Sequence, residues 1–502
     1  MSLDPPTYLS SLQNNIRARP IPWEGAVRAG TITENDLKTI KAVDKVRKEQ
    51  RRQTVESDTE SYQSLILGGE KSKSVLESAS KRADVIQYML VLTGDLINGM
   101  YLYSPCTSIV SKANSETIDA PILAPKLLQH SEPYKPLIPY LSHSTNPEDP
   151  IPLLASSVLT SLLSTAQMQS PKSDQRTDEA LNQLYKYLST LTKSQDSGLQ
   201  DIAVQEYSSL LRTKRAREIF WQQREYTVNP LIDILRTAVG ASRDSDSTLR
   251  GNGGSSIRTT TENGLSGAIG LQLLYHILLT IWQLSFEASL IGKGLEKEQE
   301  ITPLYTQLLR LSPKEKTTRL LLSTLLNLLS APSNKSTLLP AATIARLPTL
   351  LANLKGRHLT DPDLLDDLTS LTDMLTEYTS SQTTFDEYAA EVQSGRLRWS
   401  PPHRSREFWH ENARKILEDD GGALPKKLRE IMGKSWEDDK QVLAIACNDV
   451  GWLVKEAPDR RQVLEKLGIK GRVMELMTDK DEGVRWESLR AVGEWLRYSF
   501  DD

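Results

Sequence analysis

FDEYAAEVQSGRLRWSPPHRSREFWHEN, residues 385–412, is the stretch that is neither a plain helix nor a plain loop. Apolar Phe385, Tyr388 and Val392 recur there at helical spacing. Gly395 follows them and favours the end of that helix, because glycine adopts the left-handed conformation common at helix ends. The stretch therefore predicts a short helix that stops at a bend.

The bend that follows contains two adjacent prolines and is flanked by large aromatic side chains. Proline cannot continue a helix, so a rigid corner is expected where one domain joins another. The candidate domain pivot consists of Phe385, Trp399, Pro401, Pro402, Phe408 and Trp409. Its aromatic residues fit two functions equally well, packing of a linker or contact with a partner.

Upstream of this corner the chain is a succession of leucine-rich amphipathic segments, and strand-like alternation is nearly absent. The fold class is therefore all-α, and helix pairs recurring at intervals of roughly 30 to 45 residues favour a HEAT or armadillo-like solenoid. We expect the junction near 380–384, with an N-terminal helical-repeat domain over 1–380 and a smaller armadillo-like domain over 381–502. Helices are expected near 74–99, 151–166, 179–193, 199–212, 214–222, 229–239, 265–286, 301–312, 314–331, 339–355 and 361–380.

Three segments interrupt this pattern or resemble something else. Residues 104–150 are proline-rich and residues 241–262 are rich in Ser, Thr and Gly, so both are expected to be loops. Residues 263–286 carry no charged side chain and are long enough to span a bilayer. Gln272, His276 and Gln283 interrupt that stretch, which favours a buried helix at the centre of a helical array.

The C-terminal segment predicts several more helices. Gln441 to Lys455 has an apolar face, and Pro458 begins a new turn. The last helix carries Trp486, Leu489, Val492 and Leu496 at spacings of three, three and four. This arrangement is typical of one long armadillo unit with a cap.

Composition excludes several classes of protein. The net charge is −4 over 502 residues, which gives no electrostatic footprint for nucleic acid. Cys106 and Cys447 are the only cysteines and lie far apart in the sequence, which favours a reducing compartment over a disulfide framework. The first residues, MSLDPPTYLS, lack the features of a signal peptide, so a cytosolic location is expected.

No combination of residues predicts an active site. The histidines do not form a zinc-binding helix pair, and His403 and His410 are merely the two closest in sequence. Gly433-Lys434-Ser435 resembles the end of a phosphate loop, but Leu428 stands where that motif needs glycine. No metal or cofactor is therefore expected, and the protein is interpreted as a non-enzyme.

Two longer motifs are recognisable. FDEYAAEVQSGRLRWSPPHRSREFWHENARKILE at 385–418 resembles the domain-joining segment of the H subunit of the vacuolar-type proton-translocating ATPase. LAIACNDVGWLVKEAPDRRQVLEKLGIKGRVMELMTDKDEGVRWESLRAV at 443–492 resembles the closing armadillo-like unit of the same family. Weaker similarities lie upstream at 14–37, 217–235, 270–287 and 314–326.

The resemblance implies a non-catalytic regulator on the cytosolic face of vacuolar and endosomal membranes, present also in the cytosol with the detached ATP-hydrolysing sector. Its implied partners are the peripheral stalk of subunits E and G, the cytosolic part of subunit a, and the B subunit with the central rotor after detachment. Membrane association is implied only through the complex. Such a protein supports coupled ATP hydrolysis and proton transport, and silences hydrolysis by the detached sector.

By position, residues 433–440 match the inhibitory loop of that family. The residues expected to contact a partner are Lys434, Trp436, Glu437, Asp438 and Asp439. An exposed tryptophan would serve as an anchor, but a tryptophan folded back on its own domain fits equally well. The alternative function is an armadillo-type cargo or transport adaptor. That function calls for a regular ladder of Asn and Trp, and the nine tryptophans here are irregularly spaced.

Overall fold

The computed structural model describes residues 7–69, 72–97, 123–169, 174–240, 270–312, 314–381, 383–437 and 439–497. Within these ranges the regular elements are helices and no strand occurs, so the predicted all-α class is confirmed. Contacts group the chain into two units, residues 1–235 with 269–287 and residues 236–268 with 288–502. The domain boundary predicted at 380/381 stays a prediction.

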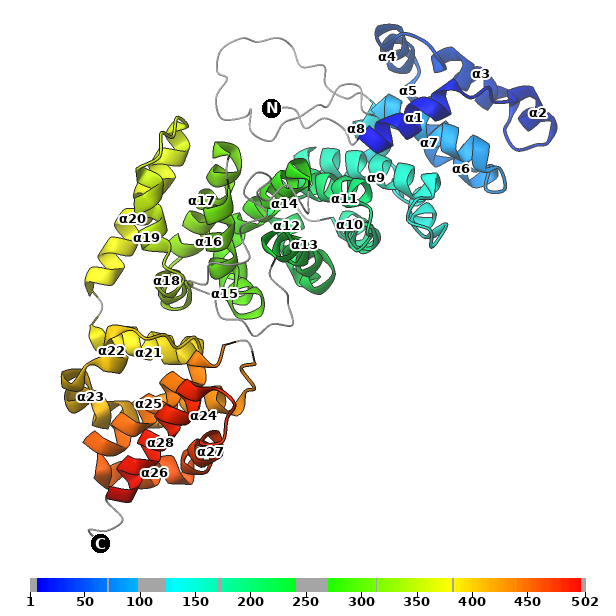
Figure 1. The fold of residues 1–502 in the computed structure, drawn as a ribbon. Coiled ribbons are helices and arrows are strands. Elements are labelled where there is room, and N and C mark those ends of the chain that lie inside the picture. The colour runs from blue at the N-terminus through cyan, green and yellow to red at the C-terminus, as the bar shows by residue number, and fades with distance from the viewer. Residues whose placement is uncertain are drawn as a thin grey trace. The chain divides into compact units, whose positions relative to one another are not determined.

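Unit 1 is a stack of helices, and Figure 1 shows α9, α10, α11 and α12 side by side. Its elements are α1 Thr7–Ala18, α2 Trp23–Arg28, α3 Glu34–Val43, α4 Lys48–Ser57, α5 Thr59–Leu67, α6 Val75–Ser78, α7 Ala83–Ile97, α8 Leu123–Leu128, η1 Ile138–Ser142, α9 Pro150–Gln169, α10 Gln175–Thr192, α11 Ser197–Leu210, α12 Lys214–Gln222, α13 Arg224–Val239 (which ends in unit 2), α14 Leu271–Leu284 and η4 Ser285–Glu287.

Unit 2 continues with helices that pack mainly on near neighbours, as in a helical-repeat protein. Its elements are α15 Ala288–Gln299, α16 Ile301–Leu311, α17 Glu315–Ser330, α18 Lys335–Ile344, α19 Leu347–Lys355, α20 Pro362–Ser381, α21 Thr384–Ser394, α22 Pro401–Arg404, α23 Arg406–Glu418, η5 Asp419–Gly421, α24 Ala423–Gly433, α25 Gln441–Glu456, η6 Pro458–Arg460, α26 Arg461–Lys466, α27 Ile469–Leu476 and α28 Glu482–Arg497. Helix α25 packs against both α23 and α28 (Figure 1).

Two predicted helices are each divided in the structure. The segment 74–99 forms α6 and α7 with a turn between them, and 339–355 forms α18 and α19. The second break falls at Arg346, which has a left-handed φ of 58°. Pro348 follows in the first turn of α19. A proline fits in this position because the backbone N–H that it lacks would have no partner within the helix. The two prolines at 401 and 402 likewise begin α22.

Helix α15 was not predicted, because two glycines and several charges weaken its local helical pattern. Tertiary contact explains one of these glycines. A Cβ atom at Gly292 would lie 2.1 Å from Asn334 Nδ2. That amide donates to Ala288 O at 2.8 Å and to Leu328 O at 2.9 Å, so it links α15 to α17.

The predicted loop at 104–150 is only partly correct. Its described portion contains the short elements α8 and η1, because Leu123, Leu127 and Leu141 are buried in the core of unit 1. The predicted loop at 241–262 lies outside the described residues.

The uncharged stretch near 263–286 contains α14, and its polar side chains find partners in unit 1. His276 Nδ1 lies 2.5 Å from Asp201 Oδ1, and Gln283 Nε2 donates to Ser208 O at 3.0 Å. Among the described residues, two helical stretches, α9 and Leu271–Gln299, are long and apolar enough to cross a membrane. However, 78% of the apolar segment of α9 and 67% of that of Leu271–Gln299 are buried inside the protein. The described part is therefore a buried helix, as predicted.

Candidate functional site

The joining segment contains a buried polar network on three helices of unit 2. His403, on α22, has Nδ1 at 2.8 and 2.9 Å from the two carboxylate oxygens of Asp449 on α25. Its Nε2 lies 2.9 Å from Glu391 Oε2 on α21. His403 and Asp449 are fully buried. The network therefore holds the bend against the long helix α25.

Both ring nitrogens of His403 face carboxylate oxygens, and a carboxylate accepts hydrogen bonds but does not donate them. Both nitrogens must then carry protons, so the ring is an imidazolium cation. Burial lowers the pKa of His403, but Asp449 and then Glu391 outweigh burial and raise that pKa to about 10. Burial also raises the pKa of Asp449. The second carboxylate nevertheless favours the charged histidine.

The network extends to the last helix through Asn448. Its Nδ2 donates to His403 O at 3.0 Å and to Asp449 Oδ1 at 3.1 Å. Its Oδ1 accepts from Arg490 on α28. Hydrogen bonds thus connect α21, α22, α25 and α28. His410 is mostly exposed and bonds to Glu456 Oε2 at 3.2 Å, so the two histidines have different roles.

The aromatic residues of the candidate pivot are mainly packing residues. Phe408 and Trp409 are buried, and Tyr388 lies against both rings, with centroids 5.4 and 5.2 Å apart. Phe385 and Trp399 are partly buried against the same core. Of the two alternatives that the sequence left open, packing describes these side chains. Motion about this segment stays a prediction.

The segment also contacts the preceding helices of unit 2. Arg396 bonds to Glu300, just before α16, with a distance of 2.6 Å between Nη2 and Oε1. Gly395 ends α21 with a left-handed φ of 74°, as the sequence predicted. Residues 395–398 therefore contact elements on both sides of the predicted domain boundary.

Residues 433–440, the tip loop, connect α24 to α25 and are the segment that by sequence position matches the inhibitory loop of the family. Trp436 is only 5% exposed, and its Nε1 donates to Ile431 O at 2.7 Å. Of the two alternatives that the sequence left open for Trp436, the exposed anchor is therefore excluded. The indole folds back because burying a large aromatic surface with its N–H satisfied is favourable. The alternative prediction, a tryptophan on its own domain, is confirmed.

The charged residues of this loop are placed differently. Lys434 and Glu437 are exposed, and Asp439 is partly buried. Asp438 lies outside the described residues. Lys440 Nζ lies 3.2 Å from Asp479 Oδ2, which fixes the end of the loop. Lys434 and Glu437 are therefore the described members of the predicted set that remain available to a partner.

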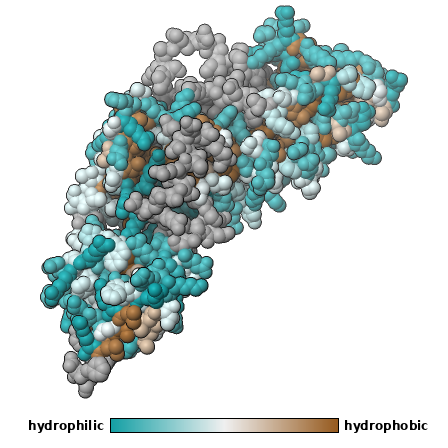
Figure 2. Space-filling model, in the orientation of Figure 1, coloured by the Kyte–Doolittle hydropathy of each residue, from teal (hydrophilic) through white to brown (hydrophobic). Residues whose placement is uncertain are grey.

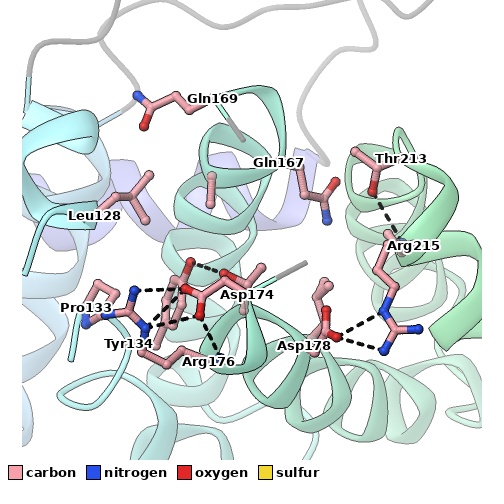
Figure 3. Close-up of a pocket in the computed structure, with 14 residues that line it drawn as sticks. Leu128, Pro133, Tyr134, Gln167, Gln169, Asp174, Arg176, Asp178, Thr213 and Arg215 are labelled. Atoms are coloured by element: carbon pink, nitrogen blue, oxygen red, sulfur yellow. Dashed lines mark hydrogen bonds and ion pairs between the residues drawn. The ribbon is translucent and has the colours of Figure 1, made fainter. Parts of the chain in front are cut away.

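A cavity of about 350 Å³ lies between α8, α9, α10 and the start of α12 (Figure 3). Arg176 pairs with Asp174 and Arg215 with Asp178, at 2.9 and 2.8 Å. The buried amide of Gln167 has no hydrogen-bond partner among the described residues. Because each arginine is already paired with an aspartate, the lining lacks the excess positive charge of a nucleotide-phosphate site.

Within the described ranges, no cluster of three or more His, Cys, Asp or Glu side chains could hold a metal ion. Sequence reasoning identified His403 but missed Glu391, Asn448 and Asp449. One signal was present, since Asn448 and Asp449 interrupt the apolar run of α25. Adjacent polar residues inside a buried helix require partners.

These features define the class of protein. The chain is an all-α, solenoid-like helical-repeat protein, stabilised at its joining segment by a buried ionic network. Two family models for the H subunit of the V-ATPase match it, over residues 7–375 and 381–500. The chain therefore belongs to the V-ATPase H-subunit family, as the resemblance indicated.

Individual relatives agree with this family. The V-type proton ATPase H subunit of Drosophila melanogaster is 32% identical over 240 residues, 47% of this chain. A probable V-type proton ATPase H subunit of Caenorhabditis elegans is 33% identical over 245 residues, 48% of this chain. These matches cover about half of each relative, 50% and 51%. The Dictyostelium discoideum H subunit is 24% identical over 87% of this chain and 82% of its own length.

Proposed function

We propose that this chain is a regulatory, non-catalytic subunit of the V-type proton ATPase, needed for coupled ATP hydrolysis and proton transport. The observation that carries the proposal is the pair of H-subunit family models that together span residues 7–375 and 381–500. The fold is compatible with it, because stacked helices present extended surfaces for other proteins. The described cavity lined by paired charges offers no nucleotide site.

The proposed partners are the other subunits of the pump. The N-terminal helices bind the peripheral stalk of subunits E and G, and the C-terminal helices bind the cytosolic part of subunit a. The protein is peripheral on the cytosolic face of vacuolar and endosomal membranes, and it reaches the membrane only through the complex. The apolar helical stretches Pro150–Gln169 and Leu271–Gln299 are mostly buried, which favours this indirect association.

Co-purification tests the proposal directly. Tagged full-length protein from its own cell should bring down subunits E and G, and its deletion should reduce proton pumping by membrane vesicles. Absence of E and G from the purified material would contradict the proposal. ATP turnover by the pure, isolated chain would contradict its non-catalytic part. Recovery of transport cargo in place of pump subunits would favour the adaptor alternative.

We also propose that the tip loop at 433–440 silences the detached ATP-hydrolysing sector by contacting the B subunit and the central rotor. Such a contact bridges stationary and rotating parts, so rotation and hydrolysis stop together. Exposed Lys434 and Glu437 are the described side chains that support this role. Buried Trp436 acts indirectly, by fixing the loop to α24.

Charge substitutions at the tip separate contact from folding. Lys434→Gln with Glu437→Gln should leave thermal unfolding unchanged, because both residues are exposed. The pair should raise ATP hydrolysis by the detached sector carrying this protein. Lys466→Gln with Glu465→Gln, at exposed positions of α26, also leaves the net charge unchanged and is the matched control. Unchanged inhibition with normal binding would exclude these two side chains from silencing.

A further inference from the structure

The outer face of α28 carries an exposed apolar stripe. Trp486, Leu489 and Leu496 are 68%, 49% and 52% exposed, and they lie with Gly493 at helical spacings of three, four and three. Figure 2 shows hydrophobic side chains gathered in the C-terminal region, near this helix. Most of the apolar residues that recur at helical spacing in α28 therefore face solvent. We call Trp486, Leu489, Gly493 and Leu496 the α28 stripe.

The α28 stripe is not the face by which α28 packs into its own domain. The opposite face of α28 is already buried through Val484, Ala491 and Trp495. It packs closely on α25, since a Cβ atom at Gly451 would lie 3.4 Å from Ala491 Cβ. A helix with one face fully packed and a second apolar face exposed is expected to have an additional binding partner.

Gly493 gives the stripe a notch. Glycine inside a helix costs about 1 kcal/mol relative to alanine. A Cβ atom at Gly493 would meet nothing within 4 Å, so the described residues do not require glycine there. A missing side chain between Leu489 and Leu496 lets a side chain or backbone of a second helix approach closely.

Basic side chains border the stripe along its length. Arg490 and Arg497 are seven residues apart, so they lie on the same side of the helix. Their side chains are 42% and 70% exposed, whereas those of their partners Glu487 and Glu494 are 12% and 14% exposed. The border therefore presents guanidinium groups more than carboxylates. Glu482 is an exposed acid at the N-terminal end of the stripe.

We propose that the α28 stripe binds an amphipathic helix of another protein, whose apolar ridge is flanked by acidic side chains. The ridge covers Trp486, Leu489 and Leu496, one of its side chains enters the notch at Gly493, and its acids meet Arg490 and Arg497. A helix lying in an apolar groove with complementary charges at the border is a recurrent mode of recognition.

Other occupants fit less well. In a pair of copies both stripes would be bordered by exposed arginines, and bringing like charges together is unfavourable. An anionic lipid surface would interact favourably with the arginines, but it carries no side chain that could fill the notch at Gly493. An acidic helix uses all three features.

Photo-crosslinking in the native cell tests this surface on the full chain. Replacing Trp486 with the photoreactive residue p-benzoyl-phenylalanine keeps an aromatic group in the stripe. The expected product joins position 486 to an apolar, acidic helical segment of another protein. Charge reversal at the exposed Arg497 alone, Arg497→Glu, leaves the bond between Arg490 and Asn448 intact and should lower its yield about tenfold. The same photoreactive residue at Gln462, exposed on α26, is the matched control and should not give this product.

Several results would overturn the inference. They are a product with lipid, a product with a second copy of this chain, absence of any defined product at position 486, or a yield that survives charge reversal. The proposed pump function has a separate test, co-purification of subunits E and G. If those subunits are recovered with the chain that carries only the photoreactive residue at 486, while no product forms at that position, the pump function stands and the α28 stripe proposal fails.

Discussion

His403 is the one cation between two carboxylates in the buried network of the joining segment, and this makes it a sensitive position for substitution. His403→Gln keeps a polar side chain of similar length but removes the positive charge. Asp449, which is fully buried, and Glu391 would then face each other without a counter-charge. Removing one partner of a buried ion pair typically costs about 3–5 kcal/mol, because the other charge stays desolvated.

This cost is expected locally, so it should be measured locally. The chain is large enough that its unfolding is not expected to be two-state. Amide hydrogen exchange of peptides from 385–412 and 441–456 reports the opening free energy of the network directly. With about 1.4 kcal/mol per factor of ten, the exchange rate there should rise by about two to four orders of magnitude.

His410→Gln is the matched control, since His410 lies on the same segment but is mostly exposed. The opening free energy that exchange reports should change by less than about 1 kcal/mol, the usual contribution of an exposed ion pair. Adding Asp449→Asn to His403→Gln should restore part of the protection, because the unpaired buried charge is then removed. Unchanged exchange in His403→Gln, or strictly additive costs in the double variant, would refute the charged network.

Three further predictions concern other buried groups. Burial raises the pKa of Glu206 to about 8 from 4.5, so the stability it contributes below pH 4.5 should be lost as pH rises through 8. Glu206→Gln, but not the exposed Glu179→Gln, should flatten the fall in thermal unfolding temperature across that window. Trp436→Ala should cost about 3–5 kcal/mol by amide exchange near the tip, and Trp436→Phe about 1 kcal/mol for the lost bond to Ile431; equal effects would contradict this role for the indole N–H. Burial raises the pKa of Cys447 to about 12, so peptide mapping after treatment of the native protein with a thiol reagent at pH 8 should find it unmodified, and rapid labelling would contradict that burial.

The candidate site shows where sequence reasoning ended. His403 was noticed only as one of two nearby histidines, because spacing along the chain does not reveal which side chains meet across helices. Glu391 and Asp449 are 12 and 46 residues away from it, and only the packing of α21, α22 and α25 brings them within hydrogen-bond distance. Trp436 had two alternatives of equal weight until its indole was placed in the core.

By itself, the sequence determined the all-α class, most of the helices, the bend after Gly395 and the resemblance to the H-subunit family. These features depend on local preferences and periodicity, which can be read along the chain. Only the tertiary structure decided that the bend is held by a buried histidine between two carboxylates. It also decided which face of α28 is packed and which is exposed. Both faces of α28 look apolar in sequence, and burial depends on neighbours that are distant along the chain.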